Sequence, residues 1–201
     1  MAEVKILVEG IHNQIREEKF DIGCTTILIK SNKNIIVDPG AFRNKNRLLE
    51  ALKKENLSPE AIDAIILTHL HLDHILNVSL FPKAKIFLRF ITGKYPGMFQ
   101  RIDKGYLERY DLLNEEIAKD IEIIDTPGHS DDHISVLVKT KQGNVVIAGD
   151  AIANQDFLNL EKCPPEFVIY NQEKFNNSRK KILKIADYII PGHGKMFKVE
   201  K

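Results

Sequence analysis

Histidine and aspartate side chains gather in four short segments of this 201-residue chain. Imidazole and carboxylate groups together suit Zn²⁺, Fe²⁺ or Mn²⁺, and the lack of thiolates in the set argues against a structural zinc site. Five histidines and two aspartates exceed the four ligands of one tetrahedral ion, so the count fits two ions that share a bridging carboxylate. The residues of the set are His69, His71, Asp73, His74, His129, Asp150 and His193.

Each segment of the set follows a short apolar run that reads as a buried strand. Because each run ends where the chain would turn, the pattern predicts a metal site assembled at strand ends that are distant in sequence. The four junctions are Ala61–Thr68 before His69, Ile121–Asp125 before Thr126-Pro127-Gly128-His129, Val145–Ala148 before Gly149-Asp150, and Tyr188–Ile190 before Pro191-Gly192-His193.

The remaining patterns predict an α+β protein with a layered αββα arrangement, not a doubly wound parallel sheet. We find no linker composition, so residues 1–201 are expected to form a single domain. Apolar spacing predicts helices over Asn44–Glu55 and Glu173–Ile185, the second with the charges of Arg179–Lys184 on its solvent face. Further strands are expected at Val4–Val8, Thr25–Lys30, Ile35–Asp38, Ala84–Leu88, Ile134–Thr140 and Asn144–Ala148.

Composition narrows the class of protein. The formal net charge of +1 gives no overall attraction to nucleic acid or to an anionic membrane. No apolar run approaches the roughly 20 residues of a membrane span, and the N-terminus has no signal-peptide pattern. The two cysteines, Cys24 and Cys163, follow no CxxC spacing, which favours a reducing, cytoplasmic location. The expected partner is a small-molecule or nucleic-acid substrate, with no membrane, and a homodimer is left open.

Four motifs resemble those of the metallo-β-lactamase superfamily, in the same order and over nearly the whole chain: HxHxDH at 69–74, TPGH at 126–129, GD at 149–150 and PGHG at 191–194. The resemblance implies an αββα sandwich with the site at one edge, where two sheets meet. It also implies two divalent ions, with zinc favoured and Fe²⁺ or Mn²⁺ left open. The implied ligands are His69, His71 and His129 for the first ion and Asp73, His74 and His193 for the second, with Asp150 between them.

The resemblance bears on the reaction as well. Asp150 stands where true β-lactamases of this fold carry Cys or Ser, which points away from antibiotic hydrolysis. The segments 76–82 and 177–183 look most similar to a compact group called metallo-β-lactamase-domain-containing protein 1, which has been linked to RNA phosphodiester hydrolysis. We therefore expect a dinuclear hydrolase of a phosphodiester, in which Asp73 binds the second ion and orients the attacking water.

Three alternatives stay open. One is a thioester or lactone hydrolase with the same two ions. Another is a mononuclear iron oxidoreductase that resembles the persulfide dioxygenases, with its iron at His69, His71, His129 and Asp150. The third, a metal-stabilised binding module without catalysis, is disfavoured because every ligand position is retained.

Four further features have weaker signals. The resemblance makes Asp38 an anchor for a ligand histidine or its loop, although a turn residue before Pro39 would look the same. His133 is expected to be a strand-start residue bonded locally, and the alternative is a proton donor to the leaving group. Residues 90–119, expected as an irregular insertion with a helical end, either bind nucleic acid through their aromatic and basic side chains or cover the core edge. His12 has no assigned role.

Overall fold

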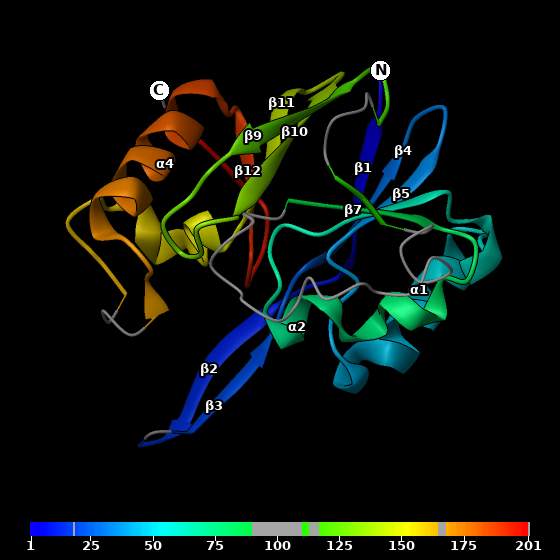
Figure 1. Cartoon of the computed structure of the whole chain (residues 1–201), viewed down its shortest axis with the longest axis horizontal. Coiled ribbons are helices and arrows are strands. Elements are labelled where there is room, and N and C mark those ends of the chain that lie inside the picture. Colours follow the sequence, from blue (N-terminus) through cyan, green and yellow to red (C-terminus); the bar gives the residue numbers. More distant parts are fainter. Residues whose placement is uncertain (18, 90–109, 113–116, 165–167, 201) are drawn as a thin grey trace.

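The computed structural model describes residues 1–17, 19–89, 110–112, 117–164 and 168–200. Within these residues two β-sheets face each other, and helices cover their outer sides (Figure 1). The first sheet has the order β1 (Glu3–Val8), β4 (Thr26–Lys30), β5 (Asn34–Val37), β6 (Ala64–Ile66), β7 (Lys85–Leu88) and β8 (Tyr110–Leu112). The second has the order β13 (Phe197–Lys198), β12 (Tyr188–Pro191), β11 (Gly143–Gly149), β10 (Ile134–Thr140) and β9 (Ile121–Asp125).

Both faces of the first sheet are buried, which explains why its strands are continuous apolar runs. Side chains alternate across a strand, so Ile27 and Ile29 of β4 enter the core between the sheets while Leu28 enters the core beneath the helices. The second sheet packs its inner face against the first and its outer face against a third apolar cluster under α4 (Gln172–Ile185). Four layers result, and the predicted αββα sandwich is confirmed.

The helices lie close to their predicted positions. On the outer side of the first sheet are α1 (Lys45–Lys54) and α2 (Leu72–Ile75), followed by a 3₁₀ turn over Leu76–Leu80. The amphipathic pattern of α4 holds for Phe175 and Ile182, which are buried, but the solvent-facing position expected for Arg179 is wrong. Its side chain is fully buried and donates hydrogen bonds to backbone carbonyls of the 157–162 loop. A guanidinium has five N–H donors and can satisfy several carbonyls at once, so Arg179 can occupy a buried position where the helical pattern would place an apolar residue.

Three expectations from the sequence need correction where strands are concerned. The run Ala61–Thr68 forms a strand only over β6, because Pro59–Ala61 is a 3₁₀ turn. Two exposed strands, β2 (Ile11–Arg16) and β3 (Lys19–Gly23), form a hairpin that was not predicted. Within the expected insertion at 90–119, Tyr110–Leu112 forms β8, whereas residues 90–109 and 113–116 lie outside the described residues.

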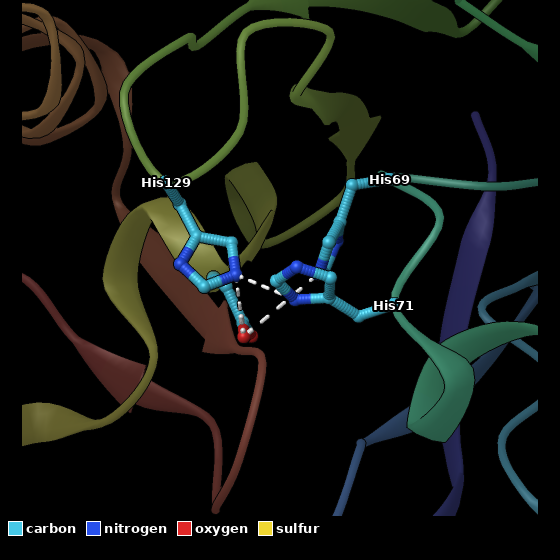
Figure 2. A group of neighbouring side chains, drawn as sticks. His69, His71 and His129 are labelled. Carbon is cyan, nitrogen blue, oxygen red and sulfur yellow. Dashed lines mark hydrogen bonds and ion pairs between the residues drawn. The ribbon is translucent and has the colours of Figure 1, made fainter. Parts of the chain in front are cut away.

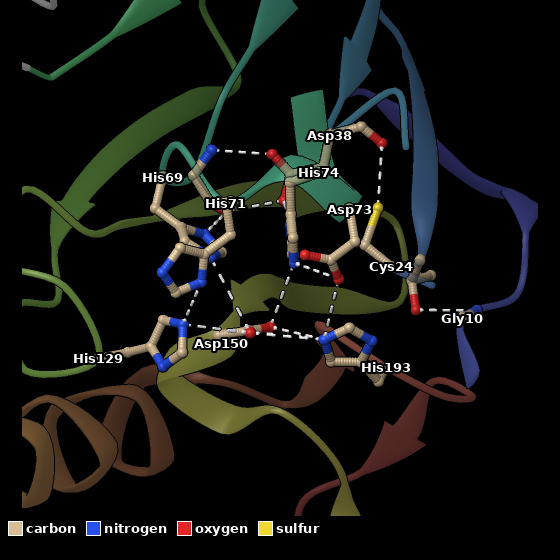
Figure 3. Close-up of polar contacts among 12 residues, drawn as sticks. Gly10, Cys24, Asp38, His69, His71, Asp73, His74, His129, Asp150 and His193 are labelled. Atoms are coloured by element: carbon tan, nitrogen blue, oxygen red, sulfur yellow. Dashed lines mark hydrogen bonds and ion pairs between the residues drawn. The ribbon is translucent and has the colours of Figure 1, made fainter. Parts of the chain in front are cut away.

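The arrangement of the layers places one set of loops together. The segments that follow β6, β9, β11 and β12 meet at one edge of the sandwich, as Figure 3 shows for their histidine and aspartate side chains. Backbone hydrogen bonds join these loops, such as Gly192 N to Gly149 O at 3.0 Å and Ile134 N to Thr68 O at 2.9 Å. In the part of the chain that is described, no helix is long and apolar enough to cross a membrane.

Candidate metal centre

The seven side chains singled out in the sequence come together at this edge in two neighbouring groups (Figures 2 and 3). Within each group, the ligand atoms all lie within 4.8 Å of one another. The first group is His69, His71, His129 and Asp150, and the second is Asp73, His74 and His193. The structure thus places every predicted ligand where it could hold a metal ion, in the grouping that the sequence resemblance implies.

Asp150 lies between the two groups, and its carboxylate is close to histidine rings of both. Its Oδ2 is 3.3 Å from Nε2 of His129 and 3.9 Å from Nε2 of His69. Its Oδ1 is 3.5 Å from Nε2 of His74, while Nε2 of His193 lies 3.3 Å from Oδ1 and 3.4 Å from Oδ2. A carboxylate in this position can bind two ions at once.

Several polar atoms that converge here lack a hydrogen-bond partner, although they are buried. Among the described side chains these include Nε2 of His69, Nε2 of His74 and Oδ1 of Asp150. Burying a nitrogen or oxygen atom without a hydrogen bond costs free energy, so these atoms are expected to have a partner other than a protein side chain, such as a bound ion. Imidazole nitrogens and a carboxylate oxygen aimed at one point supply the donor set of Zn²⁺ or a similar divalent ion. The residues present therefore fit such an ion.

Hydrogen bonds at the far side of each ring fix which nitrogen faces the centre. Nδ1 of His74 donates to Oδ2 of Asp38 at 2.8 Å, and Nδ1 of His193 donates to the carbonyl of Gly23 at 3.0 Å. Nδ1 of His69 lies 3.0 Å from Oγ1 of Thr68, whose own proton goes to Asp38, so the ring donates there too. These three rings consequently present the lone pair of Nε2 to the site, as a metal ligand must.

Asp38 anchors both sides of this arrangement, as its motif predicted. Its Oδ1 accepts from the backbone N–H of Thr68 at 2.8 Å, while its Oδ2 accepts from the Thr68 hydroxyl and from His74. The carboxylate is buried and its backbone has a left-handed φ of 50°. Thr68 was missed by the sequence reasoning, although its place directly before His69 at the strand end was a usable signal.

His133 has the local structural role that was favoured over proton donation. Its Nε2 accepts from the backbone N–H of Asp150 at 3.0 Å, so its Nδ1 must carry the proton that it donates to Oγ1 of Thr126 at 2.9 Å. The series of hydrogen bonds continues from the Thr126 hydroxyl to the Ser135 hydroxyl, which donates to the carbonyl of Ala148. Burial lowers the pKa of His133 well below its usual value, which keeps the ring neutral for this purpose. His133 therefore positions the backbone that carries Asp150.

Replacing His133 with alanine is expected to destabilise the metal-free protein by about 2 kcal/mol or more. The change leaves the N–H of Asp150 and the hydroxyl of Thr126 without their buried partner, and such losses cost about 1–3 kcal/mol each. For a chain of this length, that corresponds to a fall in the melting temperature of roughly 4–8 °C. Thermal unfolding followed by circular dichroism measures it. An unchanged melting temperature would show that the hydrogen-bond chain is dispensable.

The two groups differ in how strongly they hold protons. Burial, which opposes a positive charge, lowers the pKa of His69 well below its usual value. Burial also acts against protonation of His193, but the neighbouring carboxylate of Asp150 outweighs it and raises the pKa of His193. Burial alone would raise the pKa of Asp150, yet His193 and His74 hold it well below its usual range.

These opposite directions predict a stepwise loss of metal on acidification. Protons compete with metal ions for imidazole nitrogens, so a ligand with a raised pKa is protonated first as the pH falls. The ion of the second group, which His193 would hold, is expected to leave at a higher pH than the ion near His69. Metal content measured after dialysis at a series of pH values tests this, and simultaneous release of both ions at every pH would contradict it.

The centre opens to solvent on one side. His71 is exposed, and Asp73 keeps 26% of its side-chain surface accessible, whereas the other ligand candidates are buried. Asp73 Oδ2 lies 3.6 Å from Nε2 of His74 and 3.7 Å from Nε2 of His193. A substrate would thus reach the two groups past His71 and Asp73. Cys24 is buried nearby with a raised thiol pKa caused by burial, so it is no thiolate ligand.

Comparison with known proteins agrees with this geometry. The family model described as the metallo-beta-lactamase superfamily matches residues 21–193. The chain is 32% identical over 199 residues to metallo-beta-lactamase domain-containing protein 1 of Xenopus laevis, which covers 98% of this chain and 82% of that protein. It is 34% identical over 193 residues to a probable metallo-hydrolase of Methanocaldococcus jannaschii, with 94% and 86% covered.

A solved structure shows the same fold. A putative metallo-beta-lactamase from Thermotoga maritima superposes with a TM-score of 0.75 at 24% identity, over 98% of this chain and 99% of that one. Members of the matched family are metal-dependent hydrolases, in agreement with the donor set described above. The chain belongs to the metallo-β-lactamase superfamily.

Proposed function

We propose that this protein is a dinuclear hydrolase that uses two zinc ions to cleave a phosphodiester of the RNA type. The observation that carries the two-ion part is the position of the Asp150 carboxylate between the two groups. Its Oδ2 lies 3.3 Å from Nε2 of His129, its Oδ1 lies 3.5 Å from Nε2 of His74, and Nε2 of His193 is within 3.4 Å of both oxygens. The phosphodiester part is supported by similarity to proteins named metallo-beta-lactamase domain-containing protein 1, the group whose resemblance implied this substrate.

When bound at these two groups, divalent ions would lower the pKa of a water, polarise the phosphoryl group and neutralise the leaving oxygen. The protein's own side chains would orient the attacking water and hold the ligand rings in place. Asp73, partly open to solvent beside His74 and His193, can accept a hydrogen bond from the attacking water and orient it. The Nδ1–H bonds of His69, His74 and His193 keep the rings fixed while charge changes at the centre.

The test begins with the metal content of protein purified without added metal. The zinc-loaded protein is then assayed on an RNA oligonucleotide and on bis(p-nitrophenyl) phosphate, before and after chelation. We expect two zinc ions per chain, and turnover that chelation removes and zinc restores. A single iron per chain with oxygen uptake would instead favour the mononuclear oxidoreductase.

A thioester hydrolase is the second candidate. The chain is 36% identical over 110 residues to a protein of Pectobacterium atrosepticum named hydroxyacylglutathione hydrolase, although this match covers only 53% of the chain. The same two-ion centre would serve that reaction. Parallel assays on an acylglutathione and on the phosphodiesters separate the two, because the preferred substrate has the higher kcat/KM.

A further inference from the structure

The β2–β3 hairpin stands beside the second ligand group and extends away from the body of the molecule (Figure 1). Its base is bound to the loop that carries His193. The carbonyl of Gly23, at the end of β3, accepts from Nδ1 of His193. Thr25, the residue before β4, donates its N–H to Gly192 O at 2.6 Å. The hairpin is therefore held in a fixed position relative to the metal centre.

One face of the hairpin turns toward the centre. The register pairs His12 with Ile22 and Gln14 with Phe20, which places these four side chains on the same face. The ring of His12 lies 5.7 Å from the ring of His193, measured between centroids. The face that carries His12 thus reaches His193 of the second ligand group.

Aromatic rings form a row on this face. The ring of His12 stacks on that of Phe20, with centroids 5.5 Å apart and planes 12° from parallel, and on its other side it meets His193. Phe20 keeps 46% of its surface exposed, so the row is not explained by burial in a core. An exposed, flat π surface that starts at a catalytic centre suits a flat group of the substrate.

We propose that the His12–Phe20 stack binds a nucleobase adjacent to the phosphodiester that is cleaved. This rests on the proposed phosphodiesterase function and adds a specificity site to it. Stacking fits the observations because bases pack on aromatic faces without a need for a defined hydrogen-bond pattern. The position of the stack next to the second ligand group assigns it to a nucleotide that flanks the scissile bond.

The test compares two esters that differ only in the base. One is the p-nitrophenyl ester of uridine 5′-monophosphate, and the other is the same ester of ribose 5-phosphate without the base. In the zinc-loaded protein, Phe20→Ala is expected to lower kcat/KM about tenfold on the uridine ester, mainly through KM, and to leave the abasic ester unchanged. Phe20→Trp should retain the preference for the base.

The matched control is Ile15→Ala, since Ile15 is an exposed apolar residue of the same hairpin, 59% accessible, that takes no part in the row of rings. It should change neither ester. Equal effects of Phe20→Ala on both esters, or no effect on either, would overturn the proposal, because the hairpin would then act without reading the base.

A binding measurement separates this proposal from the proposed function. If the wild-type protein hydrolyses neither ester, phosphodiester hydrolysis fails, and the stack is judged by calorimetric titration of the zinc-loaded protein with uridine monophosphate and with ribose 5-phosphate. Tighter binding of the nucleotide that Phe20→Ala weakens supports a base-binding stack. Equal affinity for the two compounds rejects it.

Discussion

Replacing Asp150 with alanine is expected to remove hydrolysis almost completely and to leave the protein unable to hold two metal ions. Asp150 is the one described side chain that approaches both ligand groups through separate oxygens, 3.3 Å from His129 on one side and 3.3 Å from His193 on the other. In the proposed two-ion centre, its removal would cost each ion a ligand, and the histidines would lose the negative charge that offsets two cations. Stabilisation by metal ions is worth several kcal/mol in the transition state, so we expect a fall of about a thousandfold or more in kcat.

Metal analysis and turnover of the zinc-loaded variant measure this. Asp150→Asn serves as the shape-conserving variant, since it keeps the side-chain volume and removes only the charge. Asp156→Ala is the control, because Asp156 lies on the loop that follows Asp150 and its side chain is 74% exposed. Two zinc ions and full turnover in Asp150→Ala would refute the bridging role.

Much of the fold was predictable because the strands that build it are buried on both faces. Runs such as Thr26–Lys30 and Ile134–Thr140 are almost entirely buried and apolar, which is typical of strands covered on both faces. The β2–β3 hairpin lacks that signal. Its residues, from Ile11 to Gly23, are mostly exposed and polar, and the hairpin gains its position from Thr25 and His193, which are not near in sequence to each other.

The candidate ligands were predictable for a different reason. Histidine and aspartate rarely occur so close together in sequence, and each of these segments follows a predicted strand. The sequence therefore predicted that the ligands meet at one edge of the sheets. The supporting residues carry no such mark. His12, His133 and Arg179 are ordinary by local pattern, and only long-range contacts distinguish the role of each. The substrate is likewise not encoded by the ligands, since the same centre suits several hydrolyses.

Replacing Asp38 with alanine is expected to lower both stability and metal affinity. The carboxylate accepts three hydrogen bonds, from the Thr68 N–H, the Thr68 hydroxyl and the His74 ring. If these buried donors lose their acceptor at about 1–3 kcal/mol each, the loss is about 3 kcal/mol or more, or roughly 6–12 °C in melting temperature. Loss of a group that orients a metal-binding histidine typically weakens metal binding about 10–100-fold, and we expect a fall of about this size in the metal affinity of Asp38→Ala.

Asparagine at the same position separates the two causes. Asp38 has a φ of 50°, a left-handed backbone that asparagine tolerates and alanine does not, so Asp38→Asn removes the carboxylate without adding backbone strain. An amide has one acceptor oxygen, and its NH₂ would face a donor of Thr68 or His74. Asp38→Asn should therefore lose metal affinity about as much as Asp38→Ala in a chelator competition, while it loses less stability in thermal unfolding. If Asp38→Asn binds zinc as tightly as the wild type, the ring of His74 is held by its packing alone and the carboxylate is not its anchor.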